Sequence, residues 1–225
     1  MEFRFFEIYR ESEYLVLLAE GIATSVALAI GAGLLGFFLA TLMALSRYWK
    51  IRPASEIAAC FIEFFRNTPL IVQLFFFAFG LPVLLGYEWP FWAHALLALT
   101  LNFSAYFAEI LRSGFSAVSS HQSEAASALG IPRTLAFRKI VFPQAIAASF
   151  ASLNSQFVFL FLTTGIISEI GVRDLTYAGL FIDSRTFRSF EIFILLTILY
   201  IALALLFKAA LTWAYHRSFP WREFT

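Results

Sequence analysis

Long apolar stretches alternate with short polar ones along the whole chain. The first stretch, 21–45, contains no charged residue. As a helix rising about 1.5 Å per residue it would reach about 37 Å, enough to cross a hydrocarbon core of about 30 Å with some tilt. Four more stretches follow at 57–84, 91–111, 144–167 and 190–214. We therefore predict five membrane-spanning helices, of which the second is the least regular because it contains Glu63 and Arg66.

The composition supports a membrane protein. Apolar residues make up 60% of the 225 positions and charged residues 14%, whereas soluble domains average about 45–50% and about 25%. The net charge of +1 excludes a nucleic-acid-binding protein that works by bulk charge. We expect an all-α integral membrane protein in which residues 1–225 form a single transmembrane domain. The longest polar connection is 112–143.

The distribution of Lys and Arg predicts the orientation. With five spans, ten of these residues fall on the side that carries 112–143 and the C-terminus, and five fall on the other side, with Arg66 left out because it lies inside a span. Because cytoplasmic loops carry the excess of positive charge, we expect the C-terminus in the cytoplasm and the N-terminus outside. The acidic segment before the first span does not fit a cleavable signal peptide.

Small residues recur at every fourth position of the first span: Ala32, Gly36, Ala40 and Ala44. Such a series lets another helix approach closely. We interpret it as a packing surface rather than a binding site.

Charged and polar side chains inside the spans are the first candidates for function, since a charge in the bilayer centre costs about 2.5–3.5 kcal/mol on insertion scales. Glu63 and Arg66 are three residues apart and can form an ion pair; alternatively, Arg66 faces a substrate carboxylate. The segment 67–69, Asn-Thr-Pro, follows directly. Its proline should break the helix, and broken helices build binding sites in transporters.

The third span carries Asn102, Tyr106 and Glu109 on one helical stripe. Glu109 can instead form an ordinary ion pair with Arg112. Hydroxyl groups gather at the end of the fourth span, where bonds back to the preceding turn are the simpler interpretation. The candidates for a polar path through the membrane are Arg66, Asn102, Tyr106, Glu109, Thr163, Thr164 and Ser168. The three histidines and one cysteine lack metal-ligand spacing, and no catalytic constellation is apparent, so we expect neither a metal site nor an enzyme.

The polar connection contains a short alanine-rich helix with a clear end. Gly130 supplies a left-handed stop and Pro132 prevents continuation. The alanines leave one side flat, so a partner can approach closely. A second short helix, 134–141, should end at Pro143, where the fourth span begins.

This connection resembles the EAA loop of the membrane subunits of ABC importers. The matching pattern is Glu124-Ala125-Ala126, three residues, Gly130, nine residues, Ile140, one residue and Phe142-Pro143, where the family usually has Leu-Pro. Three further segments, 65–73, 105–114 and 170–176, are similar to the polar amino-acid permease branch of that family. Together the resemblance covers about 21–219.

The resemblance implies an ABC type I importer-like bundle in a bacterial inner membrane. The chain would be one of two permease subunits, identical or paralogous, that form the path for an amino acid between them. Two cytoplasmic ATPase subunits would bind ATP and Mg²⁺, and an extracytoplasmic binding protein would deliver the amino acid. Glu124, Ala125, Ala126 and Gly130 would couple the permease to the ATPase. The chain itself has no G-x-x-x-x-G-K phosphate loop.

Two questions stay open at the level of sequence. Many members of the branch have Lys-Asp-Thr-Ser-Leu where this chain has Leu162-Thr163-Thr164-Gly165-Ile166, so substrate contacts there do not transfer. We expect Glu109 to meet a substrate ammonium and Asn102 or Arg66 its carboxylate, which favours cationic or neutral amino acids. The alternative is an ion- or proton-coupled secondary transporter or channel, with Glu63 and Glu109 as ion sites.

Overall fold

The computed structural model describes residues 5–6, 8, 11–118 and 120–220. The described chain is built from helices: α2 (Ser12–Tyr48), α3 (Ala54–Arg66), α4 (Leu70–Phe75), the π-helical η1 (Phe76–Gly80), α5 (Leu81–Leu85), α6 (Phe91–Ala117), α7 (Ser120–Ala128), α8 (Arg133–Ala136), the π-helical η2 (Phe137–Val141), α9 (Phe142–Thr163), the 3₁₀-helical η3 (Thr164–Ile170), α10 (Leu175–Thr186) and α11 (Ser189–Ser218).

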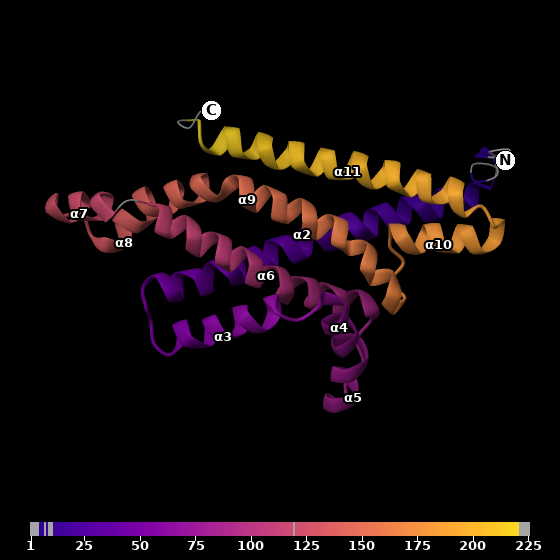
Figure 1. Cartoon of the computed structure of the whole chain (residues 1–225), viewed down its shortest axis with the longest axis horizontal. Coiled ribbons are helices and arrows are strands. Elements are labelled where there is room, and N and C mark those ends of the chain that lie inside the picture. Colours follow the sequence, from indigo (N-terminus) through magenta and orange to yellow (C-terminus); the bar gives the residue numbers. More distant parts are fainter. Residues whose placement is uncertain (1–4, 7, 9–10, 119, 221–225) are drawn as a thin grey trace.

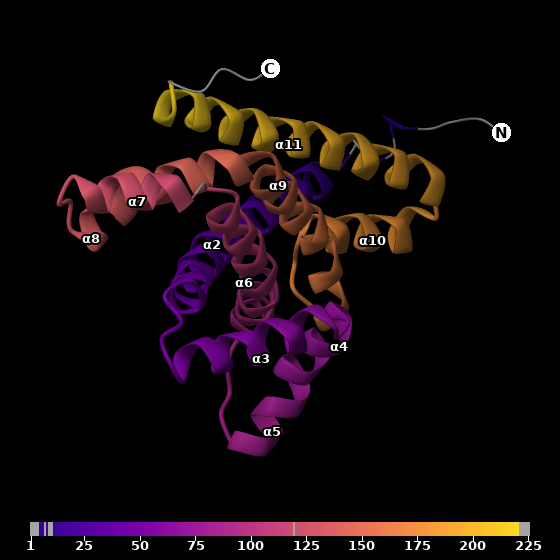
Figure 2. The same ribbon diagram turned by 60° about the vertical axis from the view of Figure 1, so that its left-hand side comes forward.

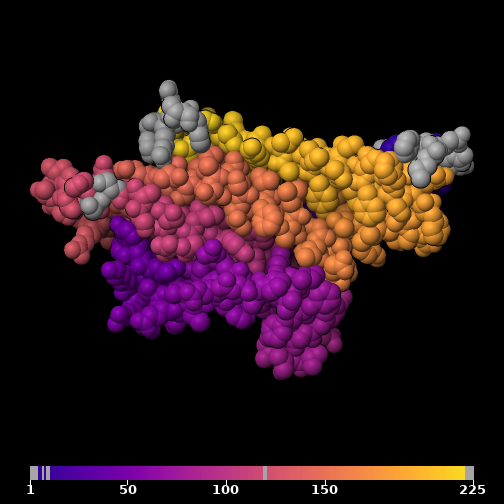
Figure 3. Space-filling model, viewed as in Figure 1, coloured from indigo at the N-terminus to yellow at the C-terminus, as the bar shows by residue number. Residues whose placement is uncertain are grey.

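Four runs of helix are long and apolar enough to cross a membrane: Ser12–Tyr48, Phe91–Ala117, Arg133–Ile170 and Ser189–Ser218. A fifth candidate is the pair Ala54–Arg66 and Leu70–Leu85, which is bent by 105°. The four long runs follow the long axis of the molecule, with α7 and α8 at one end and α10 near the N-terminus at the other (Figure 1). The bent pair forms a V beside α6 (Figure 2), and its α5 end projects from the body (Figure 3).

The contact between α2 and α6 depends on small residues. Ala32, Ala40 and Ala44 of α2 are fully buried. A Cβ atom added to Gly36 would lie 3.2 Å from the backbone oxygen of Thr100 on α6. The series of small residues therefore packs against a neighbouring helix, and it allows the two backbones to approach closely.

The connection between the third and fourth spans is shorter than 112–143. Helix α6 continues to Ala117, and α8, η2, α9 and η3 join into one apolar run, Arg133–Ile170. The helix break that we expected at Pro143 is therefore wrong. Pro143 lies in the first turn of α9, directly after the π-helical turn of η2. A shift in hydrogen-bonding pattern there accommodates a residue that has no N–H to donate.

Candidate functional site

The second span breaks at the Asn-Thr-Pro segment. Helix α3 ends at Arg66 and α4 begins at Leu70. The side chain of Asn67 donates to the backbone oxygen of Glu63 at 2.8 Å, and the hydroxyl of Thr68 donates to that of Phe64 at 2.9 Å. The side chains that follow the helix thus satisfy carbonyl groups at its end, which an interrupted helix inside a membrane requires.

A buried pair of amides holds this break against α6. Gln73 and Asn102 are 5% and 4% exposed. Nε2 of Gln73 donates to the backbone oxygens of Phe65 at 3.0 Å and Thr68 at 3.2 Å. Carbonyl oxygens only accept, so these bonds fix the orientation of the Gln73 amide and leave its Oε1 to accept from Nδ2 of Asn102 at 3.0 Å. The remaining acceptor of this pair is Oδ1 of Asn102.

A polar cavity of about 510 Å³ lies where the break, α6 and α9 meet. Four of the predicted path residues line it: Arg66, Asn102, Tyr106 and Thr163. The guanidinium carbon of Arg66 lies 5.6 Å from the centroid of the Tyr106 ring, a cation–π arrangement. Phe103 and Phe159 add apolar walls.

The expected ion pair between Glu63 and Arg66 is wrong, since no such pair forms between these two described residues. Their spacing allows pairing but does not enforce it. Helix α3 ends at Arg66, and the guanidinium lies over Tyr106 of α6 instead. Arg66 therefore lines the cavity without a close ion pair to any carboxylate in the described part of the chain, and Glu109 interacts with it only over a longer distance.

Glu109 does not line this cavity and belongs to a cluster with two arginines, although Arg66 is close enough to interact with its charge. Its carboxylate is paired with Arg112, as the spacing allows, and also lies 3.3 Å from Nη1 of Arg47 on α2. It lines a separate cavity of about 370 Å³ between α6 and α9. Arg47 is 62 residues away in sequence, so helix spacing alone could not indicate this second contact.

The hydroxyl groups near the end of the fourth span bond back to their own turns. Thr163 donates to the oxygen of Phe159 at 2.6 Å, Thr164 to Phe161 at 2.7 Å, and Ser168 to Gly165 at 2.9 Å. Thr163 is half-buried at the polar cavity, whereas Thr164 is fully buried and does not line it. Ser168 also lies outside the lining.

The EAA-like segment forms α7 and ends in a hydrogen-bonded stop. Gly130 has φ +72°, its N–H donates to Ser127, and the N–H of Ile131 donates to the oxygen of Ala126. These are the two bonds of a Schellman motif. Ala126 is buried, whereas Leu129 is 78% exposed. Glu124 and Ala125 are also exposed.

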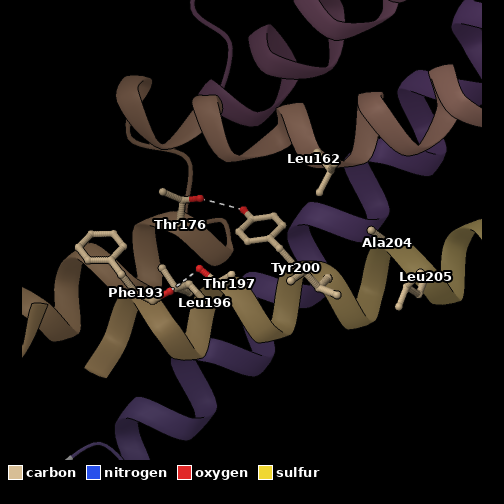
Figure 4. Close-up of a pocket in the computed structure, with 9 residues that line it drawn as sticks. Leu162, Thr176, Phe193, Leu196, Thr197, Tyr200, Ala204 and Leu205 are labelled. Carbon is tan, nitrogen blue, oxygen red and sulfur yellow. Dashed lines mark hydrogen bonds between the residues drawn. The ribbon is translucent and has the colours of Figure 1, made fainter. Parts of the chain in front are cut away.

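A third hollow, of about 470 Å³, lies beside α11 and is lined mainly by apolar side chains (Figure 4). Its main polar feature is a hydrogen bond of 2.8 Å between the hydroxyls of Thr176 and Tyr200, drawn as a dashed line. The predicted path residues do not line it. Its chemistry does not suit a zwitterion, which needs charged or strongly polar partners.

Sequence reasoning gave no role to Asp174, which is fully buried between the fourth span and α10. Its Oδ1 caps α10 by accepting from the N–H of Tyr177 at 2.8 Å, while its Oδ2 is buried without a hydrogen-bond partner. The neighbouring N–H of Leu175 donates to Ser25 of α2 at 3.2 Å. Burial raises the pKa of Asp174 to about 7. Its position after Gly171 and before a helix is a capping signal.

Residues 32–218 match the model of the family described as binding-protein-dependent transport system inner membrane component. The L-cystine transport system permease protein TcyL of Bacillus subtilis (strain 168) is 36% identical over 78% of this chain and 76% of its own length. The arginine transport system permease protein ArtQ of the same organism is 32% identical over 84% of this chain and 86% of its own length.

Solved structures agree with this assignment. A crystal structure of an amino acid ABC transporter with histidines superposes with a TM-score of 0.85 at 33% identity, covering 96% of this chain and 100% of that one. An inward-facing structure of the MetNI methionine ABC transporter gives 0.76 at 16% identity, covering 92% and 99%, and shows the shared fold. These matches favour the importer over the ion-coupled alternative. The chain belongs to the family of binding-protein-dependent inner-membrane transport components, as a multi-pass permease of an amino-acid ABC importer.

Proposed function

We propose that this chain is one of two permease subunits in an importer that holds an amino acid in the polar cavity at the break of the second span. Two cytoplasmic ATPase subunits bind ATP and Mg²⁺, and a binding protein outside supplies the amino acid. The N-terminus lies outside and the C-terminus in the cytoplasm of a bacterial inner membrane. The family match and the excess of Lys and Arg near α7 support this arrangement.

The coupling role falls to α7 and the turn after it. Glu124, Ala125 and Leu129 are exposed on a short helix at one end of the molecule (Figure 1). An exposed leucine beside small side chains offers an apolar contact to a groove on a partner. Ala126 packs inward, and the Schellman stop at Gly130 turns the chain into α8, so a movement of α7 is passed to the helix that follows.

The observation that carries the proposal is that the polar cavity is lined by both a cationic group and a hydrogen-bond acceptor. The guanidinium of Arg66 matches a carboxylate in shape and charge, and Oδ1 of Asn102 remains available to accept from an ammonium group. An α-amino acid carries a carboxylate and an ammonium group on the same carbon. Glu109 is left out of this role because two arginines already neutralise it.

The coupling role is tested with two glycine variants in proteoliposomes that contain the ATPase and the binding protein. Gly130 and Gly86 both have positive φ values, of +72° and +68°, and an added Cβ meets nothing within 4 Å at either position. Gly130→Val and Gly86→Val therefore carry similar backbone strain. We expect Gly130→Val to lose co-purification of the ATPase and ATP-driven uptake. Gly86→Val, which follows α5 at the end of the bent span, should keep the ATPase bound. Full uptake in the Gly130 variant would refute the coupling role.

A further inference from the structure

A buried polar junction holds the end of the fourth span that lies far from α7. The helical run Arg133–Ile170 ends where Gly171 takes a positive φ of +83°. The short segment 171–174 then leads into α10, and Asp174 is the N-cap of that helix. Asp174 is fully buried although it lies outside the runs that cross the membrane.

Two hydrogen bonds tie this segment to the first and the last span. The N–H of Leu175 donates to the hydroxyl of Ser25 on α2 at 3.2 Å, and Ser25 is itself fully buried. The hydroxyls of Thr176 on α10 and Tyr200 on α11 are 2.8 Å apart (Figure 4). The far end of the fourth span is therefore anchored to α2 and α11 through the residues that follow it.

The carboxyl group of Asp174 is the unsatisfied part of this anchor. Its Oδ1 accepts from the N–H of Tyr177, whereas its Oδ2 is buried without a hydrogen-bond partner among the described residues. A negative charge on a buried, unpaired oxygen is costly, and a neutral carboxyl group avoids this cost. Burial raises the pKa of Asp174 to about 7, while backbone N–H groups and the hydroxyl of Tyr200 act in the opposite direction.

The charged groups of the surrounding elements do not compensate a charge on Asp174. No ion pair to Asp174 forms in the part of the chain that the structure describes. Arg188 at the start of α11 is paired with Glu191. The other charged side chains on the nearest turns are exposed: Glu13 and Glu20 of α2, Glu169 of η3, and Arg173. The titratable side chain that acts on Asp174 is the phenol of Tyr200.

We propose that Asp174 is a positioning residue for transport: its neutral carboxyl group anchors the far end of the fourth span, and ionisation of that group loosens the anchor and slows uptake. The run Arg133–Ile170 leads from the turn after α7 to the polar cavity. A displacement imposed at α7 therefore moves the cavity wall effectively only while the other end of the run is held. In the orientation given under the proposed function, on which this step rests, Asp174 responds to the pH outside.

The test measures uptake into proteoliposomes that contain ATP in a lumen of fixed pH, so that only complexes whose ATPase faces the lumen work. The binding protein and a mixture of radiolabelled protein amino acids are added outside, at pH values from 6 to 8. Wild type is compared with Asp174→Asn, whose amide can still accept from the N–H of Tyr177 and does not ionise. The ratio of the two initial rates cancels effects of pH on the binding protein.

The neutral fraction of a group with a pKa of about 7 falls about tenfold between pH 6 and 8, so the ratio of wild-type to variant rate should fall more than about threefold. A smaller change would overturn the inference. Returning the outside pH to 6 should restore the wild-type rate, whereas a lasting loss would indicate unfolding and overturn it as well.

Two further variants locate the effect. Asp183→Asn, on the same helix, removes a carboxylate that accepts from the hydroxyl of Ser189 and should keep the wild-type pH profile; a flat profile would overturn the role of Asp174. Tyr200→Phe removes a hydroxyl that lowers the pKa of Asp174, so the fall should move to higher pH, and an unchanged or lower midpoint would contradict the junction. Control of the ratio by the pH of the lumen, in place of the pH outside, would refute the proposed orientation and leave the positioning role of Asp174 supported.

Discussion

The buried carboxyl group of Asp174 should make the fold less stable as the pH rises. Asp174 is fully buried, and burial raises its pKa from 3.8 to about 7. A raised pKa means that the folded state binds the proton more tightly than the unfolded state does. The resulting stabilisation is complete below about pH 4, and it is lost as the pH rises through about 7.

The size of the effect follows from the shift. With pKa values of 3.8 unfolded and about 7 folded, linkage gives a stabilisation of about 2.7 kcal/mol at pH 5 and close to zero at pH 8. We expect Asp174→Asn to remove this dependence, because an amide oxygen can still accept from the N–H of Tyr177 and an amide does not ionise. Above pH 7 the Asn variant should be the more stable protein.

The assay is thermal unfolding of the detergent-solubilised protein at several pH values between 5 and 8, with wild type and Asp174→Asn in the same buffers. The difference in Tm between the two proteins should change steadily across this range, to the advantage of the variant at high pH. Asp183→Asn is a control, because Asp183 accepts from the hydroxyl of Ser189 at an exposed site. Parallel pH profiles of wild type and Asp174→Asn would refute the reasoning.

Three further predictions concern the positions that build the bundle and the site. Gly36→Ala should lower Tm, because the added Cβ meets the backbone of α6 at 3.2 Å. Gly31→Ala is the control: its Cβ meets only the end of the Leu96 side chain, so it should raise Tm slightly through helix propensity. A shift of Tm in the same direction for both variants would contradict the packing argument. Gln73→Glu keeps the shape but loses the donors to the carbonyls of the break, so unfolding should cost about 1–3 kcal/mol less in thermal or denaturant melts, and an unchanged melt would argue against the amide pair. Glu109→Gln should lower Tm by leaving Arg47 and Arg112 without a carboxylate, while amino-acid binding by the membrane complex changes less than about threefold; a tenfold loss of binding at unchanged Tm would instead place Glu109 in the substrate site.

The sequence predicted those features that depend on short stretches of chain. The apolar runs were long enough to identify the spans, because crossing a membrane sets a minimum length. The break at 67–69 followed from its proline, and the structure adds that Asn67 and Thr68 cap carbonyl groups there. The stop at Gly130 followed from the residue type that tolerates a positive φ. Each of these depends on neighbours within a few residues.

The partners of the polar side chains could not be predicted in the same way. Spacing of three residues allowed both the Glu63–Arg66 pair and the Glu109–Arg112 pair, but only the second forms. The difference is tertiary, since Arg66 meets a ring on α6. The amide of Gln73 had no assigned role because its partners lie five, eight and 29 residues away. Pro143 does not end the helix, because the π-helical turn before it shifts the hydrogen-bonding pattern at the point where the proline has no N–H to donate.

The two walls of the polar cavity are held in different ways, which would suit its proposed role in transport. The wall formed by the break and α6 is joined by the hydrogen bonds of Asn102 to Gln73 and Phe65. Beside the cavity, the wall from α9 meets it through aromatic contact, with the rings of Phe159 and Phe103 6.0 Å apart. A hydrogen bond from Ser149 of α9 to the backbone oxygen of Ile110, at 3.4 Å, lies farther along the two helices. Apolar contacts permit sliding at lower cost than hydrogen bonds between fixed partners permit.

The moving wall is also the one that reaches the coupling segment. A single helical run, Arg133–Ile170, leads from the turn after α7 to Thr163 at the cavity. A displacement imposed on α7 by a partner would therefore shift Thr163 and Phe159 relative to Arg66 without breaking the amide pair. The cavity wall that carries Thr163 and Phe159 then lies on the element that changes position, so under the proposed function the release of the amino acid depends on one helix.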